Sequence, residues 1–191
     1  PPIFEKIIRL EPVDTSFSLN DIVALGSQIE YSHFAVTSVQ NWVKRDFKEL
    51  IGPPRHGRKY SINQAAILFI IEDLKSSLDF ESIRKLLTFI FHHEDPKVDL
   101  MDPVDLYAGY SAIFEELDRN NDQVLDLNGQ GHQEQNNDHL MENLIRQRAD
   151  QFVQSLPGLE QSQKEAVRNT IVIAMLSVQS AYFQSLAKRF L

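Results

Sequence analysis

The amino-acid sequence predicts an all-α protein with a small wing, in which a helical unit at residues 19–95 precedes a C-terminal helical bundle at residues 96–191. Three observations predict this class. Apolar side chains recur three and four residues apart, which places them on one face of a helix. Side chains that can cap a helix stand just before several of these runs. Segments with proline or glycine separate the runs and end the helices.

Residues 1–18 form an N-terminal arm in this prediction. Its apolar side chains have helical spacing, so we expect the arm either to dock on the main body as a short amphipathic helix or to be a partly disordered tail. These side chains are Ile3, Phe4, Ile7, Ile8 and Leu10.

The helical unit is predicted to contain helices near residues 19–27, 38–48, 62–76 and 80–92. Most begin with a capping-box pattern, in which a hydroxyl accepts from an early backbone N–H and a later side chain reaches back. The pairs are Ser18 with Asp21, Thr37 with Gln40, and Ser61 with Gln64, and Asp79 is the expected cap of the last helix. The predicted core consists of Ile22, Val23, Leu25, Val39, Val43, Phe47, Leu68, Phe69, Leu74, Phe80, Ile83, Leu86, Leu87 and Ile90.

The run Ala65–Ile71 is apolar throughout, so its periodicity alone fits a buried strand as well as a helix. Its capped start and its charged continuation "EDLK" favour the helix. We therefore assign it to the helix predicted near residues 62–76.

Pro96 and Pro103 disfavour a continuous helix, so the boundary between the two parts of the chain is placed after residue 95. Further helices are predicted near residues 104–118, 138–155 and 160–190. The polar stretch at 119–137 is expected to be a long loop. Because the last helix is apolar almost all round at residues 171–176, we expect it to be central and buried.

Composition excludes several classes of protein and site. The chain has no cysteine, which rules out disulfides and thiol nucleophiles and favours a cytoplasmic location. No run approaches the roughly 18 consecutive apolar residues of a membrane span, and no signal peptide is visible, so no membrane partner is predicted. The formal net charge of −8 argues against indiscriminate nucleic-acid binding but leaves room for a local basic face.

Positive charge gathers at residues 37–61, where six Lys and Arg residues are opposed by two acidic ones. The helices predicted at 20–27 and 38–48 make a helix-turn-helix candidate with the connector between them. Gln and Asn can bond a base edge with two hydrogen bonds, and Lys and Arg can hold phosphates. The second helix presents Ser38, Gln40, Asn41, Lys44, Arg45 and Lys48, whereas Val39, Val43 and Phe47 lie on another face.

The segment that follows fits a short wing beside this helix. A Pro-Pro pair stiffens its entry, and Gly57 permits a tight turn. Arg55, Arg58 and Lys59 would project from the loop. A basic helix and a basic loop can together straddle a DNA backbone.

The motifs of residues 19–92 together resemble the DNA-binding domain of MerR-type winged helix-turn-helix regulators and their excisionase-like relatives. The resemblance rests on "VTSVQNWVKR", "GPPRHGRKYS" and "LDFESIRKLL", in that order. It implies DNA contacts from Ser38, Gln40, Asn41, Lys44 and Arg45 of the helix, and from Arg55, Arg58, Lys59 and Tyr60 of the wing. The whole chain resembles a family of predicted Bacillus-type transcriptional regulators that carries a domain of unknown function.

Two features depart from the MerR pattern. Trp42 stands where MerR proteins carry Tyr, which brings the helix nearer the excisionase-like variants. We interpret Trp42 as a core or groove-edge aromatic rather than a platform for base stacking. The prolines after residue 92 are incompatible with the long antiparallel dimerisation helix of MerR regulators. The resemblance therefore does not extend to their dimer geometry or effector sensing.

Two patterns suggest a metal ion and are better explained otherwise. Asp118–Gly129 places oxygen ligands at EF-hand positions but lacks the turn glycine and the bidentate Glu, so we predict a polar loop. His92 and His93 diverge by about 100° on a helix, so we interpret them as a solvated helix end. No hydroxyl triad, phosphate-binding glycine loop or zinc motif is recognisable, so no enzyme and no cofactor are predicted.

These observations predict a sequence-specific DNA-binding transcriptional regulator, a repressor by default, that binds double-stranded DNA as a homodimer. Residues 96–191 carry eight basic and fourteen acidic residues, so this part is expected to serve dimerisation, ligand response or both. The alternative is a protein–protein interaction module whose basic face binds an acidic partner. Six aromatic side chains would line an effector pocket or fill the core, and the core is favoured: Tyr107, Tyr110, Phe114, Phe152, Tyr182 and Phe183.

Overall fold

The computed structural model describes residues 15–29, 32–55, 57–91, 99–127 and 137–191. In chain order the elements are β1 (Ser16–Phe17), α2 (Leu19–Gly26), α3 (Val36–Asn41), η1 (a π-helical turn, Trp42–Asp46), α4 (Lys48–Ile51), β2 (Tyr60–Ser61), α5 (Ile62–Leu74), α6 (Phe80–Ile90), α7 (Pro103–Leu127), α8 (Asn137–Gln154) and α9 (Gln161–Lys188). Helices dominate the part of the chain that the structure describes, as the sequence predicts. The strand alternative for Ala65–Ile71 is excluded because this run lies inside α5.

Side-chain caps fix the starts of α2 and α5. Ser18 Oγ accepts from the Asp21 N–H at 3.2 Å, and the Asp21 carboxylate accepts from the Ser18 N–H at 2.8 Å. The same reciprocal pair joins Ser61 and Gln64, at 3.2 and 3.0 Å. Each pair satisfies backbone donors that a helix start leaves without partners. Both predicted capping boxes are confirmed.

The other two predicted helix starts have different outcomes. Asp79 caps α6 by accepting from the Ser82 N–H at 2.7 Å, as predicted. The predicted cap at Thr37 is wrong, because α3 begins at Val36, two residues before the predicted start, and Thr37 lies within its first turn. Ala35 occupies the cap position and offers no side-chain acceptor. The connector before α3 is held elsewhere, since the His33 N–H donates to the Glu72 carboxylate of α5 at 2.9 Å.

A two-stranded antiparallel sheet joins the end of the N-terminal arm to the chain that follows the basic loop. Ser16 pairs with Ser61 and Phe17 pairs with Tyr60. The pairing fixes the exit of the loop at the residue that caps α5. The rest of the predicted arm, residues 1–14, lies outside the described residues.

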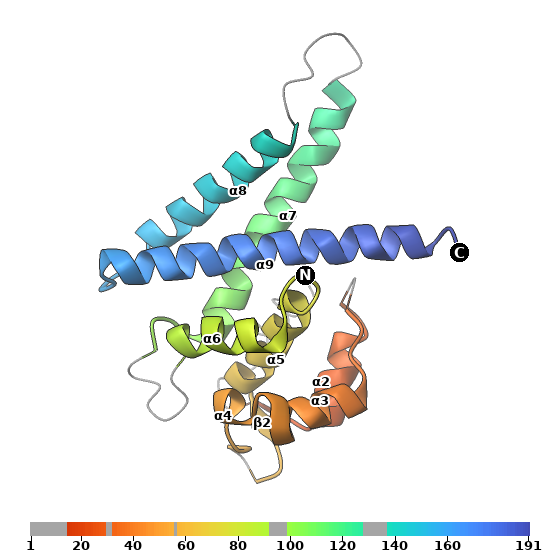
Figure 1. Ribbon diagram of the computed structural model, residues 1–191, viewed down its shortest axis with the longest axis vertical. Coiled ribbons are helices and arrows are strands. Elements are labelled where there is room, and N and C mark those ends of the chain that lie inside the picture. The colour runs from red at the N-terminus through yellow and green to blue at the C-terminus, as the bar shows by residue number, and fades with distance from the viewer. Residues whose placement is uncertain (1–14, 30–31, 56, 92–98, 128–136) are drawn as a thin grey trace.

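α5 is the centre of the molecule. Ten of its 13 residues are buried, and it contacts α7, α9 and β2. One hydrophobic core includes side chains from α2 through α9, and the Phe69 and Tyr107 rings meet across α5 and α7 at 5.9 Å. Figure 1 shows α2, α3, α4 and β2 at one end of the molecule and the hairpin of α7 and α8 at the other. The predicted boundary after residue 95 falls within 92–98, outside the described residues.

α7 continues far beyond its predicted end at residue 118. The stretch "RNNDQVLDL", predicted to begin a loop, is helical to Leu127. It has no proline or glycine to stop the helix that begins at Pro103. The helical backbone also excludes an EF-hand loop at 118–127, while residues 128–136 lie outside the described ranges.

α7 and α8 approach closely at Gly109. A Cβ atom at this glycine would come within 2.6 Å of the Phe152 ring, so only glycine allows this packing. Arg148 of α8 forms an ion pair with Glu116 of α7 at 2.5 Å, and Arg168 of α9 forms one with Asp150 of α8 at 3.5 Å. Such partly exposed pairs contribute little stability, so the apolar contacts hold this hairpin together.

α9 runs across the middle of the molecule and then passes beyond it (Figure 1). Its buried residues are Val167, Thr170, Ile171, Ala174, Met175, Ser177 and Val178. On other faces, Leu176 is 47% exposed and Phe183 is 57% exposed. The prediction of a central, buried helix is therefore right for the inward face of its first two thirds and wrong for the remainder.

Candidate nucleic-acid interface

One face of α3, η1 and α4 is polar and exposed, and the loop before β2 continues it. We call these side chains the basic surface. Its members are Gln40, Asn41, Lys44, Arg45 and Lys48 from the helical segment, and Arg55, Arg58 and Lys59 from the loop. All of them are exposed. Of the other two predicted contact residues, Ser38 is partly buried and Tyr60 is buried in β2 at 7% exposure, which leaves its ring without access to a large partner.

The opposite face of the same segment is anchored in the core. Val39 is 0% exposed, Trp42 is 3% exposed and Phe47 is 1% exposed. The Trp42 ring meets Phe34 and Phe80 edge-on, each at 6.3 Å between centroids. These contacts confirm Trp42 as a core aromatic and leave no free ring face for base stacking.

A π-helical turn sets the division between the two faces. The Phe47 N–H donates to the Trp42 carbonyl at 2.9 Å, five residues back instead of four. The wider turn holds one extra residue, so that Trp42 and Phe47 both point inward while Lys44 and Arg45 stay outside. Phe47 then leaves helical geometry, with φ −128°, and α4 begins at Lys48. The predicted helix at 38–48 is thus two helical pieces joined by this turn.

Arg84 of α6 holds the end of the π-helical turn. Its Nη1 donates to the Asp46 carbonyl at 3.0 Å, and its guanidinium lies 5.9 Å from the Phe47 ring centroid. The bond satisfies a carbonyl that the end of a helical turn leaves without an intrahelical donor. Sequence reasoning missed this role because Arg84 is 38 residues from Asp46 and its helical spacing marks it only as exposed.

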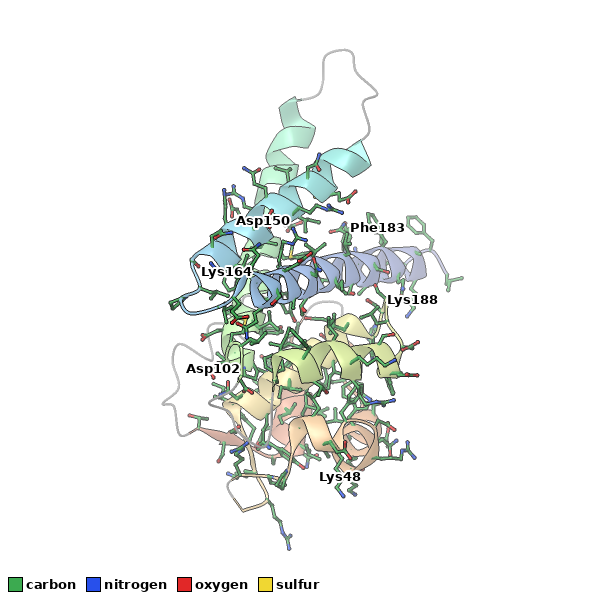
Figure 2. The ribbon with its side chains drawn as sticks, turned by 60° about the vertical axis from the view of Figure 1, so that its left-hand side comes forward. Lys48, Asp102, Asp150, Lys164, Phe183 and Lys188 are labelled. Atoms are coloured by element: carbon green, nitrogen blue, oxygen red, sulfur yellow. The ribbon has the colours of Figure 1, made fainter. Side chains whose placement is uncertain are left out.

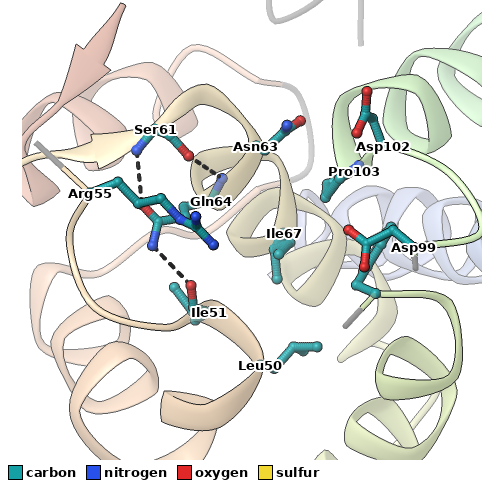
Figure 3. A pocket seen from close by; sticks show the side chains of 11 residues that line it. Leu50, Ile51, Arg55, Ser61, Asn63, Gln64, Ile67, Asp99, Asp102 and Pro103 are labelled. Atoms are coloured by element: carbon teal, nitrogen blue, oxygen red, sulfur yellow. Dashed lines mark hydrogen bonds between the residues drawn. The ribbon is translucent and has the colours of Figure 1, made fainter. Parts of the chain in front are cut away.

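Gln64 fixes the entry and the exit of the basic loop. Its Nε2 donates to the carbonyls of Ile51 and Pro53, at 2.9 and 2.7 Å, while its Oε1 accepts from the Ser61 N–H. Figure 3 shows this side chain between the loop and the start of α5. The sequence revealed Gln64 as a capping residue, but its contacts with the loop depend on the tertiary fold.

A pocket of about 230 Å³ lies beneath the loop. Arg55 lines it together with Asp99 and Asp102, which lie in the segment just before α7 (Figure 3). Acidic groups therefore share the surroundings of Arg55. Gly57, with φ 66°, makes the turn at the tip, and a Cβ there would meet nothing within 4 Å. Arg58 and Lys59 follow this turn and are exposed.

Acidic neighbours reduce the positive potential of the basic surface only in part. Arg45 Nε lies 3.0 Å from Asp46 Oδ1, and this hydrogen bond raises the pKa of the Arg45 guanidinium. The pKa of the Asp21 carboxyl is lowered chiefly by its hydrogen bonds with Ser18, with a smaller contribution from the charge of Lys59. Burial raises the pKa of Tyr60.

The other candidate sites of the sequence are not assembled. Among the described residues, no three His, Asp or Glu side chains are grouped as a metal site, and His92 and His93 lie outside those residues. The six aromatic side chains do not line one pocket. Tyr107 and Tyr110 are buried in the core, Phe114 and Phe152 pack against it, and Phe183 is exposed, in ring contact with Tyr182.

α9 is long and apolar enough to cross a membrane by length and composition. Only 33% of its most apolar 18-residue window is buried. Within the described residues it is the helix that meets this test, although core helices of other proteins meet it too.

Comparison with known proteins places the basic surface inside a recognised family region. The family model described as "Domain of unknown function (DUF1836)" matches residues 14–110, from β1 to the first turns of α7. A Bacillus subtilis (strain 168) protein, "Uncharacterized protein YkrK", is 34% identical over 173 residues, which cover 90% of this chain and 70% of that protein. No solved structure matches the chain.

Proposed function

The chain belongs to the DUF1836 family of domains of unknown function, and from this premise we propose that it is a sequence-specific DNA-binding protein that regulates transcription. One observation carries the proposal. The segment α3–η1–α4 buries Val39, Trp42 and Phe47 on one face and exposes the polar and basic side chains of the basic surface on the other. This is the arrangement that a groove-reading helix needs, because its fold must not depend on the face that the DNA covers.

In this proposal α2 and α3–η1 form a helix-turn-helix of the MerR-like winged type, and the loop before β2 is its wing. α2 packs against α3, and the loop lies beside α4 at the same end of the molecule (Figure 1). A helix of ordinary diameter fits the major groove of B-DNA. The wing can then follow the adjacent backbone.

The side chains divide into base readers and phosphate binders. Gln40 and Asn41 carry amides that can bond an adenine edge with two hydrogen bonds. Lys44, Arg45 and Lys48 lie further along the segment, where cations suit phosphates. Arg58 and Lys59 of the wing add phosphate contacts, whereas Arg55 shares its pocket with carboxylates and is expected to contribute less. Tyr60 is not included, because it is buried.

Charge also orients the molecule on DNA. Residues 37–61 carry six basic and two acidic residues, whereas residues 96–191 carry eight basic and fourteen acidic residues. A polyanion attracts the first region and repels the second. The hairpin of α7 and α8, at the opposite end of the molecule from Lys48 (Figures 1 and 2), would therefore point away from the DNA.

We further propose that the protein works in the cytoplasm as a homodimer, with repression as the default effect. A symmetric dimer would present two basic surfaces and would favour DNA sites with two-fold symmetry. No catalytic step, metal or cofactor is part of this proposal.

The proposal is tested by selecting bound duplexes from a random DNA pool at about 0.15 M salt, near physiological ionic strength. We expect an enriched motif. Gln40→Ala should relax the preference at one base position, with a loss of about 1–3 kcal/mol for the preferred base. Arg58→Ala should weaken binding about equally on all sequences and reduce the slope of log K against log salt by about 1.

The matched control is Arg146→Ala, which removes an exposed Arg from α8 instead of the basic surface. It should leave both the motif and the salt slope unchanged. No enrichment, together with feeble binding at low salt alone, would contradict DNA recognition. A partner captured through the basic surface without any duplex preference would instead support the protein-interaction alternative.

A further inference from the structure

The outward face of α9 carries large apolar side chains at a seven-residue spacing. We call Leu176, Gln179, Phe183 and Leu186 of α9, together with Phe190 in the turn that follows α9, the outer stripe. Leu176, Phe183 and Phe190 are each seven residues apart and are 47%, 57% and 86% exposed. Gln179 and Leu186 follow Leu176 and Phe183 by three residues. This a and d spacing is the pattern by which one long helix packs along another.

The outer stripe is separate from the face that α9 buries in its own chain. At about 100° per residue, Leu176 lies roughly 200° around the helix from Ala174, which is fully buried. Figure 2 shows Phe183 on the side of α9 opposite to Lys188. α9 therefore has two apolar faces, and its own chain fully covers one of them.

We propose that the outer stripe is the surface through which two copies of this chain pair, with the two α9 helices antiparallel. This inference rests on the proposed function, in which the protein is a homodimer, and it identifies the surface through which the dimer forms. If the two-fold axis lies between Gln179 and Ser180, Leu176 meets Phe183 of the second copy, and Phe183 meets Leu176 of the second copy. The stripe is then complementary to itself, as a symmetric interface requires.

The charge of α9 favours a second copy over another partner. The nineteen residues from Asn169 to Ala187 include no Asp, Glu, Lys, Arg or His. A surface without charge offers nothing to a charged partner, and an identical uncharged stripe matches it along its length. Gln179 and Ser180, small or polar side chains at the proposed axis, would set the register, as single polar seam residues do in coiled coils.

Insertion of α9 across a membrane is incompatible with the fold. Val167, Ile171 and Ala174 of the same helix are 0% exposed in the core, so a spanning α9 would have to leave its contacts with α5 and α8. Surface binding to lipid usually requires basic side chains along the polar face of the helix. The uncharged run from Asn169 to Ala187 supplies none.

The test measures the oligomeric state of the full chain by sedimentation velocity without DNA. We expect a dimer for the natural protein. Phe183→Glu should raise the dissociation constant of the dimer at least ~100-fold, because each copy would bury a carboxylate against Leu176 of the other. Gln184→Glu places the same charge one residue on, about 100° around the helix, and should leave the dimer intact. Circular dichroism and urea unfolding establish that both variants fold.

A cross-link provides a second readout. Because the chain has no cysteine, Gln179→Cys introduces a single thiol next to the proposed axis. Mild oxidation should join two copies rapidly, whereas Gln184→Cys should cross-link slowly, since its thiols would lie too far apart for a disulfide.

Several outcomes would overturn the pairing. They are a natural protein that is monomeric at every concentration, a dimer that Phe183→Glu does not weaken, or equal cross-linking of the two cysteine variants. A monomer that floats with phosphatidylglycerol vesicles would assign the stripe to a lipid surface instead. Since none of these measurements involves DNA, a dimer that selects no DNA motif would refute the proposed function and leave this interface standing.

Discussion

α5 and α9 look alike in the sequence and differ in what covers them. Each contains an uninterrupted apolar run, "AAILFII" in α5 and "IVIAML" in α9. Ten of the 13 residues of α5 are buried, whereas seven of the 28 residues of α9 are buried. Neighbouring helices surround α5, whereas Leu176 and Phe183 in the outer stripe of α9 are exposed to solvent.

This difference shows that an apolar run predicts a buried helix but does not identify what buries it, which can be the same chain or a second molecule. For α5 the cover is the chain itself, from β2, α7 and α9. For the outer stripe of α9, we propose that a second copy of the chain packs against it. Substitutions matched between the two helices should therefore affect different equilibria, namely folding for α5 and association for α9.

The largest expected effect is that of Leu68→Ala in α5. Leu68 is 0% exposed, so truncation should leave a cavity and lower the free energy of unfolding by about 3 kcal/mol. Leu176→Ala removes the same atoms from a side chain that is 47% exposed. At a protein concentration where the natural chain is monomeric, it should cost less than about 0.5 kcal/mol. Urea unfolding of both variants measures the two values.

The concentration dependence sharpens this comparison. At a protein concentration above the dissociation constant, Leu176→Ala should cost more, because association stabilises the natural fold by mass action. The loss in Leu68→Ala should stay the same at both concentrations. Equal losses in the two variants under dilute conditions would show that the two helices are covered alike, which contradicts the comparison.

A smaller effect, dependent on pH, is expected from Asp73, near the end of α5. Burial raises the pKa of Asp73 to about 7, although the hydrogen bond from the Tyr110 hydroxyl at 2.5 Å opposes the rise. The unfolded carboxyl loses its proton near pH 4, and the folded one holds it until about pH 7. The contribution of Asp73 to stability is therefore fully present at low pH and declines as the pH rises from about 4 through 7.

Asp73→Asn should remove this decline. We expect the loss of unfolding free energy between pH 5 and pH 8 to be smaller in the variant by on the order of 2 kcal/mol. Glu81→Gln, at an exposed carboxyl of α6, is the control and should keep the natural pH dependence. An unchanged pH profile in Asp73→Asn would mean that this carboxyl titrates as it does in water. Urea unfolding across this pH range provides the data.

The smallest effect compares the starts of the two helices. Ser61 caps α5 in a reciprocal pair with Gln64, and Ser61→Ala should cost about 1 kcal/mol. At α9 the Glu160 N–H donates to Gln163 at 2.9 Å in an exposed position. Gln163→Ala should therefore cost less than about 0.5 kcal/mol. Thermal unfolding at pH 7 compares the two variants, and a larger loss for Gln163→Ala would reverse the order expected here.

Local patterns in the sequence predicted much of the fold. Ser18, Ser61 and Asp79 cap helices as expected because capping depends on residues only three positions apart. The extension of α7 to Leu127 was missed because its last turns are polar, and composition alone favours a loop there. The failure at Thr37 shows that a capping pattern also needs an extended backbone at the right residue.

The sequence predicted which residues make up the candidate site, but it did not predict the tertiary contacts that hold them in place. Gln40, Lys44 and Lys48 were found because their four-residue spacing and their charge are visible in the sequence. Arg84 and the loop contacts of Gln64 depend on residues that come together only in the folded chain. The burial of Tyr60 follows from its pairing with Phe17, a contact between segments 43 residues apart.

The π-helical turn at Trp42–Asp46 has a consequence for gene variation in this family. A π turn is equivalent to an α-helix with one inserted residue. Deleting a single codon within the turn would therefore restore regular winding and place Phe47 four residues after Trp42, on the same helix face. Phe47 would stay in the core, and Lys48 would keep its direction. Alignments of relatives that keep the same inward residues can therefore have a gap of one residue between positions 42 and 46, and the loop tip at Gly57, with open space around it, can accept length changes as well.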